Sequence, residues 1–324
     1  MAKKSIMTTS VALCTYNGEA YLEEQLKSIL NQTVQPNEII ICDDRSKDNS
    51  VEIARKILSG WNGKWEVIIN EKNLGFRKNF QKAISLCHGD IIFLSDQDDV
   101  WDTEKLEKML PVFQDPNVIL AFHDAILVNE NLEQLYPSFW ETLGFNPCDF
   151  TKGDYRIVLA HNVMQGAACC FRRKLFDIAA PFPVEAIHDE WLLLVGLSIG
   201  KVVPVCQTLL QYRQAQNAIG GLPLTFYQKL LKWHKAVHEG LYIHSKYLNN
   251  RYQVFTLLTN RIKKFNDNRQ LCGQLYEFCK FLSMRIRLSK NIIARVPKKE
   301  YYNWYFHTEA KKQWLKDWLY FLHL

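Results

Sequence analysis

The chain has 324 residues, of which 48% are apolar and 13% aromatic, and its net charge is +6. This length is enough for one large or two ordinary domains, and the apolar content predicts a packed core and excludes a disordered chain. No stretch of about 18 apolar residues indicates a membrane-spanning helix, and no apolar signal segment follows the basic start Met1-Ala2-Lys3-Lys4.

The charge is distributed unevenly. Residues 222–324 contain 19 lysines and arginines but only 6 acidic residues, so this tail carries +13 and the first 221 residues carry −7. Gly220, Gly221 and Pro223 mark the change in composition. We therefore expect two domains, 1–221 and 222–324, with different roles.

The nine cysteines fit neither a zinc site nor a disulfide framework, because their number is odd and no C-x-x-C spacing occurs. Six lie in or beside apolar runs, where cysteine behaves as a small hydrophobic residue: Cys14, Cys42, Cys87, Cys169, Cys170 and Cys206. This usage predicts a reducing, cytoplasmic location.

Strands alternate with helices over the first hundred residues. Apolar runs predict strands at 8–14, 38–42, 65–69 and 91–94, and apolar residues at helical spacing predict helices at 21–30, 51–58 and 77–86. This order with short loops predicts an α/β fold with a mainly parallel sheet and helices on both faces.

The elements after Trp101 are less regular. A helix follows this residue, and a second covers 192–199. Separate strands are predicted at 118–122, 125–128, 202–205 and 209–213. The irregular aromatic stretch 137–150 is interpreted as a lid or acceptor loop.

Three of the predicted strands end in polar loops: Thr15-Tyr16-Asn17, Asp43-Asp44 and Asp96 to Asp99. Ligands of open α/β sheets bind beyond the carboxyl ends of the strands. A dinucleotide dehydrogenase and a P-loop NTPase are both disfavoured, because neither G-x-G-x-x-G nor G-K-[ST] follows the first strand.

The acidic loop is the most informative of the three. Asp96, Asp98 and Asp99 fall within four residues, directly after the apolar run 91–94. Buried carboxylates repel one another, and Mg2+ or Mn2+ is the simplest partner for such oxygen ligands. The alternative is an acidic surface turn without a ligand, which is the usual interpretation of a lone D-x-D.

Four segments together resemble the inverting family 2 glycosyltransferases with a GT-A fold: residues 11–17, 40–48, 73–75 and 96–101. Later residues look like the bacterial rhamnosyltransferase-like branch of that family: Gly166, His188-Asp189-Glu190-Trp191 and Tyr212-Arg213-Gln214 with Asn217. The match covers about residues 8–221, and the tail adds a C-terminal helical region. Each motif alone is weak, whereas four in order on strand ends are specific.

The resemblance implies a nucleotide-sugar site. Thr15, Tyr16 and Asp44 would hold the base and ribose, and the Asp44 carboxylate is able to accept an imide N–H of uracil or thymine. The other residues assigned to this site are Asn17, Asp43, Asn73, Lys78, Asp96, Gly166, Trp191 and Arg213. For Asp43 a turn-capping role and for Lys78 a solvated position remain open, whereas the Arg213 guanidinium suits a phosphate.

Asp96, Asp98 and Asp99 would share the ribose contact and a Mg2+ or Mn2+ ion, which would neutralise the diphosphate and stabilise the leaving group. In the resembling branch a histidine follows the Tyr-Arg-Gln motif, but Ala215-Gln216 stands there in this chain. The last ligand of the metal is therefore left open.

Asp189 is the catalytic base that the resemblance implies, because an inverting transfer needs a carboxylate to take the proton of the acceptor hydroxyl. Asp189 and Glu190 as plain helix-capping acids are the alternative. His188 would orient the base, contact substrate or have a structural role.

The tail combines basic and aromatic residues, which suits an anionic membrane surface. A helical region packed on the sheet or on a second subunit, as in a homo-oligomer, is the alternative.

These features predict transfer of a sugar from a UDP- or dTDP-sugar, with dTDP-L-rhamnose as one candidate. The expected acceptor is a saccharide or a lipid-linked saccharide of O-antigen or capsule, used in the cytoplasm or peripherally at the inner face of the membrane. A metal-dependent nucleotidyltransferase is the enzymatic alternative, but it usually has a Gly-rich loop after the first strand. An RNA-binding protein is disfavoured by the acidic front domain and by the absence of RRM or KH patterns, so no nucleic acid partner is expected.

Overall fold

A computed structural model describes residues 7–214, 249–260 and 269–290 of the chain. The chain divides into two compact units, one made of residues 1–151 and 163–220 and the other of residues 152–162 and 221–324. The first unit contains the sheet and every residue that was assigned to the candidate site.

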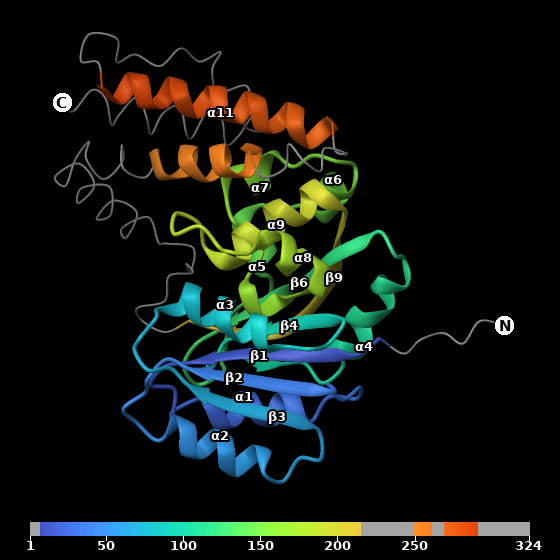
Figure 1. Cartoon of the computed structure of the whole chain (residues 1–324). Helices are drawn as coiled ribbons and strands as arrows, with labels where there is room; N and C mark the ends of the chain where they lie inside the picture. Colours follow the sequence, from blue (N-terminus) through green and yellow to red (C-terminus); the bar gives the residue numbers. More distant parts are fainter. Residues whose placement is uncertain (1–6, 215–248, 261–268, 291–324) are drawn as a thin grey trace. The chain divides into compact units, whose positions relative to one another are not determined.

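The first unit is built on one mixed sheet, whose order among the described residues is β3-β2-β1-β4-β8-β6-β9-β5, with β7 paired to β6 (Figure 1). Its strands are β1 (Thr9–Thr15), β2 (Glu38–Asp43), β3 (Lys64–Ile69), β4 (Ile91–Ser95), β5 (Val100–Trp101), β6 (Val118–Val128), β7 (Gln134–Tyr136), β8 (Cys169–Arg172) and β9 (Lys201–Arg213).

Helices surround this sheet in the first unit: α1 (Leu22–Leu30), α2 (Ser50–Leu58), α3 (Phe76–Leu86), α4 (Lys105–Met109), α5 (Phe139–Leu143), α6 (Pro147–Thr151), α8 (Arg173–Ala179) and α9 (His188–Ile199). Two short 3-10 helices add η1 (Leu110–Gln114) and η2 (Gly166–Ala168).

The parallel half, β1 to β4, confirms the predicted α/β pattern. Strands β1, β2 and β4 are buried along their whole length, as expected for apolar strands covered on both faces. Helices α1 and α2 pack on each other and α3 packs on β1 and β2. Because the chain steps from β1 to β3 and then back past β1 to β4, right-handed crossovers place α3 on the opposite face (Figure 1).

The register of this half fixes where the loops emerge. Thr15 pairs with Asp43, and Leu13 pairs with Ser95, in parallel ladders. The polar loops after β1, β2 and β4 therefore leave the sheet at one edge, which is the arrangement expected from the sequence.

The mixed half differs from the prediction in its strands. Residues 118–128 form one strand rather than two, with register shifts around Asp124, and residues 201–213 likewise form the single strand β9. The two lie parallel to each other, whereas β8 runs antiparallel to both β4 and β6. The polar residues His123-Asp124 and Gln207-Thr208, which suggested breaks, are accommodated by these local irregularities.

Helices also begin in places that the sequence did not predict. The stretch 137–150 is not irregular: α5 and α6 begin in it, and α5 is capped by the hydroxyl of Ser138, which accepts from the Glu141 amide. Helix α9 begins at His188, so Asp189 and Glu190 lie in its first turn rather than before it.

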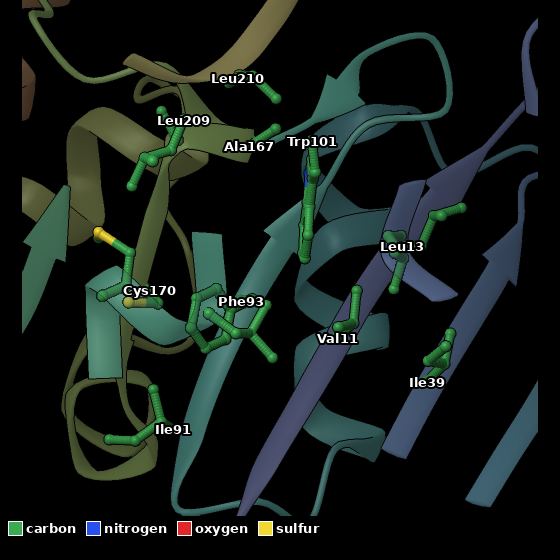
Figure 2. Packing of buried hydrophobic residues seen from close by; sticks show 14 of the residues in the cluster. Val11, Leu13, Ile39, Ile91, Phe93, Trp101, Ala167, Cys170, Leu209 and Leu210 are labelled. Atoms are coloured by element: carbon green, nitrogen blue, oxygen red, sulfur yellow. The ribbon is translucent and has the colours of Figure 1, made fainter. Parts of the chain in front are cut away.

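The core continues from the parallel half into the mixed half. Figure 2 shows Val11, Leu13 and Phe93 of the parallel strands in one cluster with Cys170 of β8 and Leu210 of β9. All of them are less than 2% exposed. The two halves of the first unit therefore share one hydrophobic core, which holds the strand ends in fixed relative positions.

All nine cysteines are free thiols. Five of the six expected in apolar runs are buried, but Cys206 is exposed, because it begins a run of three exposed residues, 206–208, in the middle of β9. No helix within the described ranges is long and apolar enough to cross a membrane.

In the second unit, residues 152–162 pack with helices of the tail. This unit contains α7 (Arg156–Ala160), a helix at 249–260 and α11 (Arg269–Lys290). Arg251 donates to the Leu159 carbonyl at 2.5 Å, and Gln274 accepts from the Tyr155 amide at 2.9 Å. The tail's predicted helical character is thus present in its described parts, while the predicted boundary and most of the aromatic and basic positions lie outside them, as do Ala215-Gln216 and Asn217.

Candidate functional site

A pocket of about 360 Å³ opens where the parallel strands end. It brings together six of the predicted site residues, which come from four loops at this edge: Thr15, Tyr16, Asp44, Asn73, Asp96 and Asp98. Cys14, Gly75, Phe76, Asn79, Phe80 and Gln97 complete the lining. The pocket combines carboxylates, amides and aromatic rings, a lining that suits a polar ligand with a flat ring.

Gln97 joins the loop after β1 to the loop after β4. Its side-chain oxygen accepts from the Thr15 hydroxyl and the Tyr16 amide, each at 2.7 Å. The sequence indicated Thr15 and Tyr16 but not Gln97, although Gln97 lies inside the acidic motif. Thr15 is therefore held in place by the loop after β4 rather than by its own strand end alone.

Asp44 holds the loop at 73–75 that faces it. Its carboxylate accepts from the Leu74 amide at 2.7 Å, the Gly75 amide at 2.8 Å and the Asn70 side chain at 2.8 Å. A carboxylate has about four acceptor positions. One therefore remains for a further donor, such as the imide of a nucleobase.

Asp43 and Asn17 make contacts typical of turn residues. Asp43 is fully buried and accepts from both the amide and the hydroxyl of Ser46. Asn17 adopts a φ of 50° and accepts from the Lys47 amide at 2.9 Å, a conformation that asparagine tolerates better than most residues. Both side chains shape the loops, and neither lines the pocket.

The three acids of the motif face different surroundings. Asp96 and Asp98 line the pocket, whereas Asp99 is 1% exposed and its carboxylate accepts from the backbone amide of Arg213 at 3.2 Å. Burial raises the pKa of Asp96 to about 7, and the charges of Asp98 and Asp189 add to the shift. Burial, with the charges of Asp98 and Asp96, also raises the pKa of Asp99 well above its usual value.

The carboxylate oxygens of the acidic loop are suitable ligands for a divalent cation, but the three acids do not converge on one point. Within the part of the chain that the structure describes, no group of three or more His, Cys, Asp or Glu side chains is arranged to hold a metal ion. Asp96 and Asp98 are the two that reach the pocket. A cation between them would relieve the repulsion that raises the Asp96 pKa, and it would take further ligands from the substrate or water.

Across from the acidic loop lies the first turn of α9. A Cβ atom on Gly166 would lie 3.0 Å from His188 Nε2 and 3.7 Å from Asp189 Oδ2, so glycine allows this close approach. Because the Asp189 charge raises the Asp96 pKa, the two carboxylates lie within electrostatic range of each other. Gly166 and Asp189 are thus brought to the acidic loop as the sequence predicted.

His188 stacks on Phe80 with ring centroids 4.2 Å apart, and neither ring nitrogen has a hydrogen-bond partner among the described residues. Burial, together with the charge of Arg77, lowers its pKa to about 3. His188 is therefore neutral at pH 7 and packs behind an aromatic residue of the pocket wall.

Arg213 is buried and engaged by the protein itself. Its guanidinium donates to the Asp98 carbonyl at 2.7 Å, to Glu24 at 2.6 Å and to the Glu130 carbonyl. It also lies 4.6 Å from the centre of the Tyr21 ring. These contacts brace the acidic loop, so a phosphate contact would require some of them to be exchanged.

Lys78 and Trp191 also lie outside the pocket lining. Lys78 lines a separate cavity of about 320 Å³ with Phe182 and Val184. Trp191 is 1% exposed and its indole donates to the Ala179 carbonyl at 2.9 Å. Trp191 is buried because it lies in the apolar helix α9, and its closeness to Asp189 in the sequence does not bring it to the pocket.

Lys105 was missed because one lysine in a helical pattern usually lies in solvent. It is completely buried, with Nζ 2.5 Å from the Ala167 carbonyl and 3.7 Å from the centre of the Trp101 ring. Burial lowers its pKa to about 7, although the charges of Asp99 and Asp96 oppose the shift. Lys105 thus supports the turn that contains Gly166.

These features, a mixed sheet whose parallel strands end in an acidic loop facing a carboxylate of α9, are those of an α/β protein with a polar ligand site at the strand ends. A model of the family "Glycosyl transferase family 2" matches residues 10–178, more than half of the chain. The chain therefore belongs to glycosyl transferase family 2.

Three proteins of known name or structure are similar to the chain. The dTDP-rhamnosyl transferase RfbG of Shigella flexneri is 32% identical over 147 residues, which cover 44% of this chain and 48% of RfbG. S. aureus TarS 1-349 in complex with UDP-GlcNAc aligns with a TM-score of 0.61 at 15% identity and covers 96% of this chain and 89% of that one. Mannosyltransferase PcManGT from Pyrobaculum calidifontis, in complex with GDP-Man and Mn2+, aligns with a TM-score of 0.54 at 14% identity, covering 99% and 86%.

The two structures confirm the predicted GT-A type of fold, a mainly parallel sheet flanked by helices. The chain spans between 38% and 60% of the length of the first curated relatives that it matches.

Proposed function

We propose that this protein is an inverting glycosyltransferase that moves a sugar from a UDP- or dTDP-sugar to a saccharide or lipid-linked saccharide acceptor. The observation that carries the proposal is the position of Asp189, which faces the acidic loop across Gly166 within electrostatic range of Asp96. An inverting transfer needs this pairing, because a base must act on one face of the sugar while the leaving group departs from the other.

The donor would occupy the pocket at the strand ends. The free acceptor position of Asp44 suits the imide of uracil or thymine, and Asp96 suits the ribose hydroxyls at the other end of the lining. Asp189 would take the proton of the acceptor hydroxyl as its oxygen attacks the anomeric carbon. The proton then resides on the Asp189 carboxylate and the nucleoside diphosphate leaves.

Mg2+ or Mn2+ fits the two carboxylates that line the pocket, Asp96 and Asp98. When bound, the cation would neutralise the diphosphate and stabilise the charge that develops on it. Asp99 serves in this proposal as a buried support of the loop rather than as a ligand, because the Arg213 amide already occupies one of its oxygens.

One relative supports a finer proposal for the donor. Similarity to a dTDP-rhamnosyl transferase makes dTDP-L-rhamnose the first donor to test, and it agrees with a role in O-antigen or capsule synthesis. The tail's role at an anionic membrane surface or in a homo-oligomer, and with it a peripheral place on the inner face of the membrane, stays a prediction, since most of residues 222–324 lies outside the described parts.

Thermal unfolding with and without nucleotides tests the proposal. UDP or dTDP with Mn2+ should raise Tm. A donor panel with analysis of the product's anomeric configuration follows. Absence of any shift with all nucleotides, or a product that retains the donor's configuration, would refute the proposed function.

A further inference from the structure

The side chain of Gln165 lies between two carboxylates of the acidic loop. Its amide nitrogen is 3.2 Å from Asp96 Oδ2 and 3.3 Å from Asp99 Oδ2. Its oxygen accepts from the backbone amide of Ala168 at 2.9 Å. That last contact fixes the orientation of the amide, so both N–H hydrogens point at the acids.

One amide group donates to two neighbouring acids, the buried Asp99 and the partly buried Asp96. Each carboxylate accepts one of the two N–H hydrogens. This shared donor offsets the repulsion between the two carboxylates. This hydrogen bond opposes the burial that raises the Asp96 pKa. Gln165 is itself 8% exposed, so solvent competes little for these contacts.

The two acids are not equivalent ends of this bridge. Asp99 is fixed, since its second oxygen accepts from the Arg213 amide, whereas Asp96 lines the pocket. Gln165 therefore ties the Asp96 carboxylate to Asp99, whose own position is fixed by the Arg213 amide. Without it, the Asp96 side chain would be free to rotate away from Asp99 into the pocket.

The turn that carries Gln165 is anchored independently. The buried Lys105 donates to the Ala167 carbonyl at 2.5 Å, two residues further along the chain. Gly166, which lies between Gln165 and Ala167 in the sequence, approaches His188 and Asp189 closely. One short turn thus contacts both the acidic loop and the proposed base. Because Lys105 anchors this turn, the turn restricts the movement of both.

We propose that Gln165 is a positioning residue, which holds the Asp96 carboxylate in the orientation that receives a divalent cation and the donor's ribose and diphosphate. This inference rests on the proposed function and adds a residue that no motif indicated. The amide does not touch the substrate; it acts through Asp96.

The first test compares Gln165→Met with a matched control, Gln32→Met. Gln32 is a similarly buried glutamine at 4% exposure, which donates to the Ser28 and Asp102 carbonyls and accepts from the Leu106 amide. Both variants lose a comparable hydrogen-bonded amide, so both should lower the Tm of the free protein. Only the first removes a donor from the acids.

The readout is the Mn2+ concentration that gives half of the UDP-dependent Tm increase. Supports of metal-binding groups typically change affinity by about 10- to 100-fold, so Gln165→Met should raise this concentration by about that factor. Gln32→Met should leave it within about twofold. Equal effects in the two variants, or an unchanged Mn2+ requirement in Gln165→Met, would overturn the inference while leaving the proposed function intact.

Gln165→Glu gives a second test that needs no nucleotide. Glutamate keeps an acceptor for the Ala168 amide but replaces the donor with a third carboxylate beside two others. The free protein should then have a lower Tm than Gln165→Met, and Mn2+ alone should restore more of it. A Tm equal to that of the wild type would show that the amide is not between the acids.

These measurements separate the two proposals. If wild-type protein gains no Tm from any nucleotide, the proposed function fails, and the inference fails with it. If wild type responds and the Gln165 variants respond equally, only the inference fails.

Discussion

The parallel half and the mixed half of the first unit build the site in different ways. In the parallel half, Asp44 and Asp96 directly follow their strands, and neighbouring loops are hydrogen-bonded to each other, as Gln97 is to Thr15 and Asp44 to Gly75. In the mixed half, Gly166 lies in a 3-10 turn, Asp189 in the first turn of a helix and Arg213 at the end of a long strand. Repeated β-α units position a ligand by register, whereas the mixed half positions single groups by close packing.

This difference assigns the two halves separable tasks in the proposed reaction. Strand register in the parallel half serves binding of the nucleotide, and the packed turn at Gly166 serves placement of the base. Apart from Gln165, which links the turn at Gly166 to the acidic loop, changes in one half should therefore alter binding or turnover without altering both.

Replacing Asp189 by asparagine should give the largest effect. Loss of a general base typically costs about 10²- to 10⁴-fold in turnover, and the Asp189→Asn variant has no carboxylate at this position to take the acceptor's proton. The UDP-dependent Tm increase should remain, because Asp189 does not line the nucleotide pocket. Initial rates of sugar transfer at saturating donor, measured beside the thermal shift, provide both readouts.

The matched control is Asp177→Asn, an exposed aspartate of α8 in the same half. It should leave both readouts unchanged. Near-normal turnover of Asp189→Asn would show that another residue is the base. Loss of the Tm increase would show that the mixed half also contributes to nucleotide binding.

The sequence predicted the parallel half almost completely. Observed strand and helix bounds in this half lie within about one residue of those expected for β1, β3 and α3, because apolar period and turn residues act locally there. The mixed half was less predictable. Strands β6 and β9 tolerate polar interruptions through register shifts against each other, and such tolerance depends on a partner distant in the sequence.

The site shows the same division. Asp44, Asp96 and Asp98 were found by motif and strand end, and the structure brings them to one pocket. Gln165 and Lys105 could not be found this way, since nothing local distinguishes them from ordinary polar residues. Their importance arises from burial between elements that meet only in the folded chain.

Replacing Asp98 by asparagine tests the binding half with a smaller expected effect. We expect nucleotide binding in the presence of Mn2+ to weaken by more than about 100-fold, since even indirect supports of a metal cost about 10- to 100-fold. The Tm of the free protein should stay the same or rise, because burial raises the Asp98 pKa and a neutral side chain avoids that cost. A titration of UDP at fixed Mn2+, followed by Tm, measures the change.

The contrast with Asp189→Asn sharpens this prediction. Asp98→Asn should lose binding and Asp189→Asn should lose turnover. If Asp98→Asn binds UDP and Mn2+ as tightly as wild type, the cation site does not involve this acid.

The smallest expected effect concerns the opposite end of the parallel strands. Glu38 at the start of β2 accepts from the Ser10 hydroxyl at 2.6 Å and the His88 amide at 2.7 Å, and it pairs with Lys64 at 2.6 Å. Although burial alone raises its pKa, these contacts outweigh burial and lower the pKa from 4.5 to about 2. The ionised Glu38 therefore stabilises the fold fully above about pH 4.5, and this stabilisation is lost as the pH falls towards 2.

Glu38→Gln should accordingly lower the free energy of unfolding by about 2 kcal/mol at pH 7, the typical size for a buried hydrogen bond to a charged group. The difference from wild type should shrink below about pH 4.5, because protonation of Glu38 removes the same charge. Denaturant unfolding at pH 7 and pH 3.5 measures it, with Glu104→Gln in the exposed pair with Lys108 as a control of less than about 0.5 kcal/mol. Nucleotide binding should not change, since Ser10 and Glu38 pair at the end of the β1–β2 ladder that is remote from Thr15 and Asp43. A loss of binding in Glu38→Gln would show that the pairing register of β1 and β2, on which the pocket loops depend, requires this buried charge.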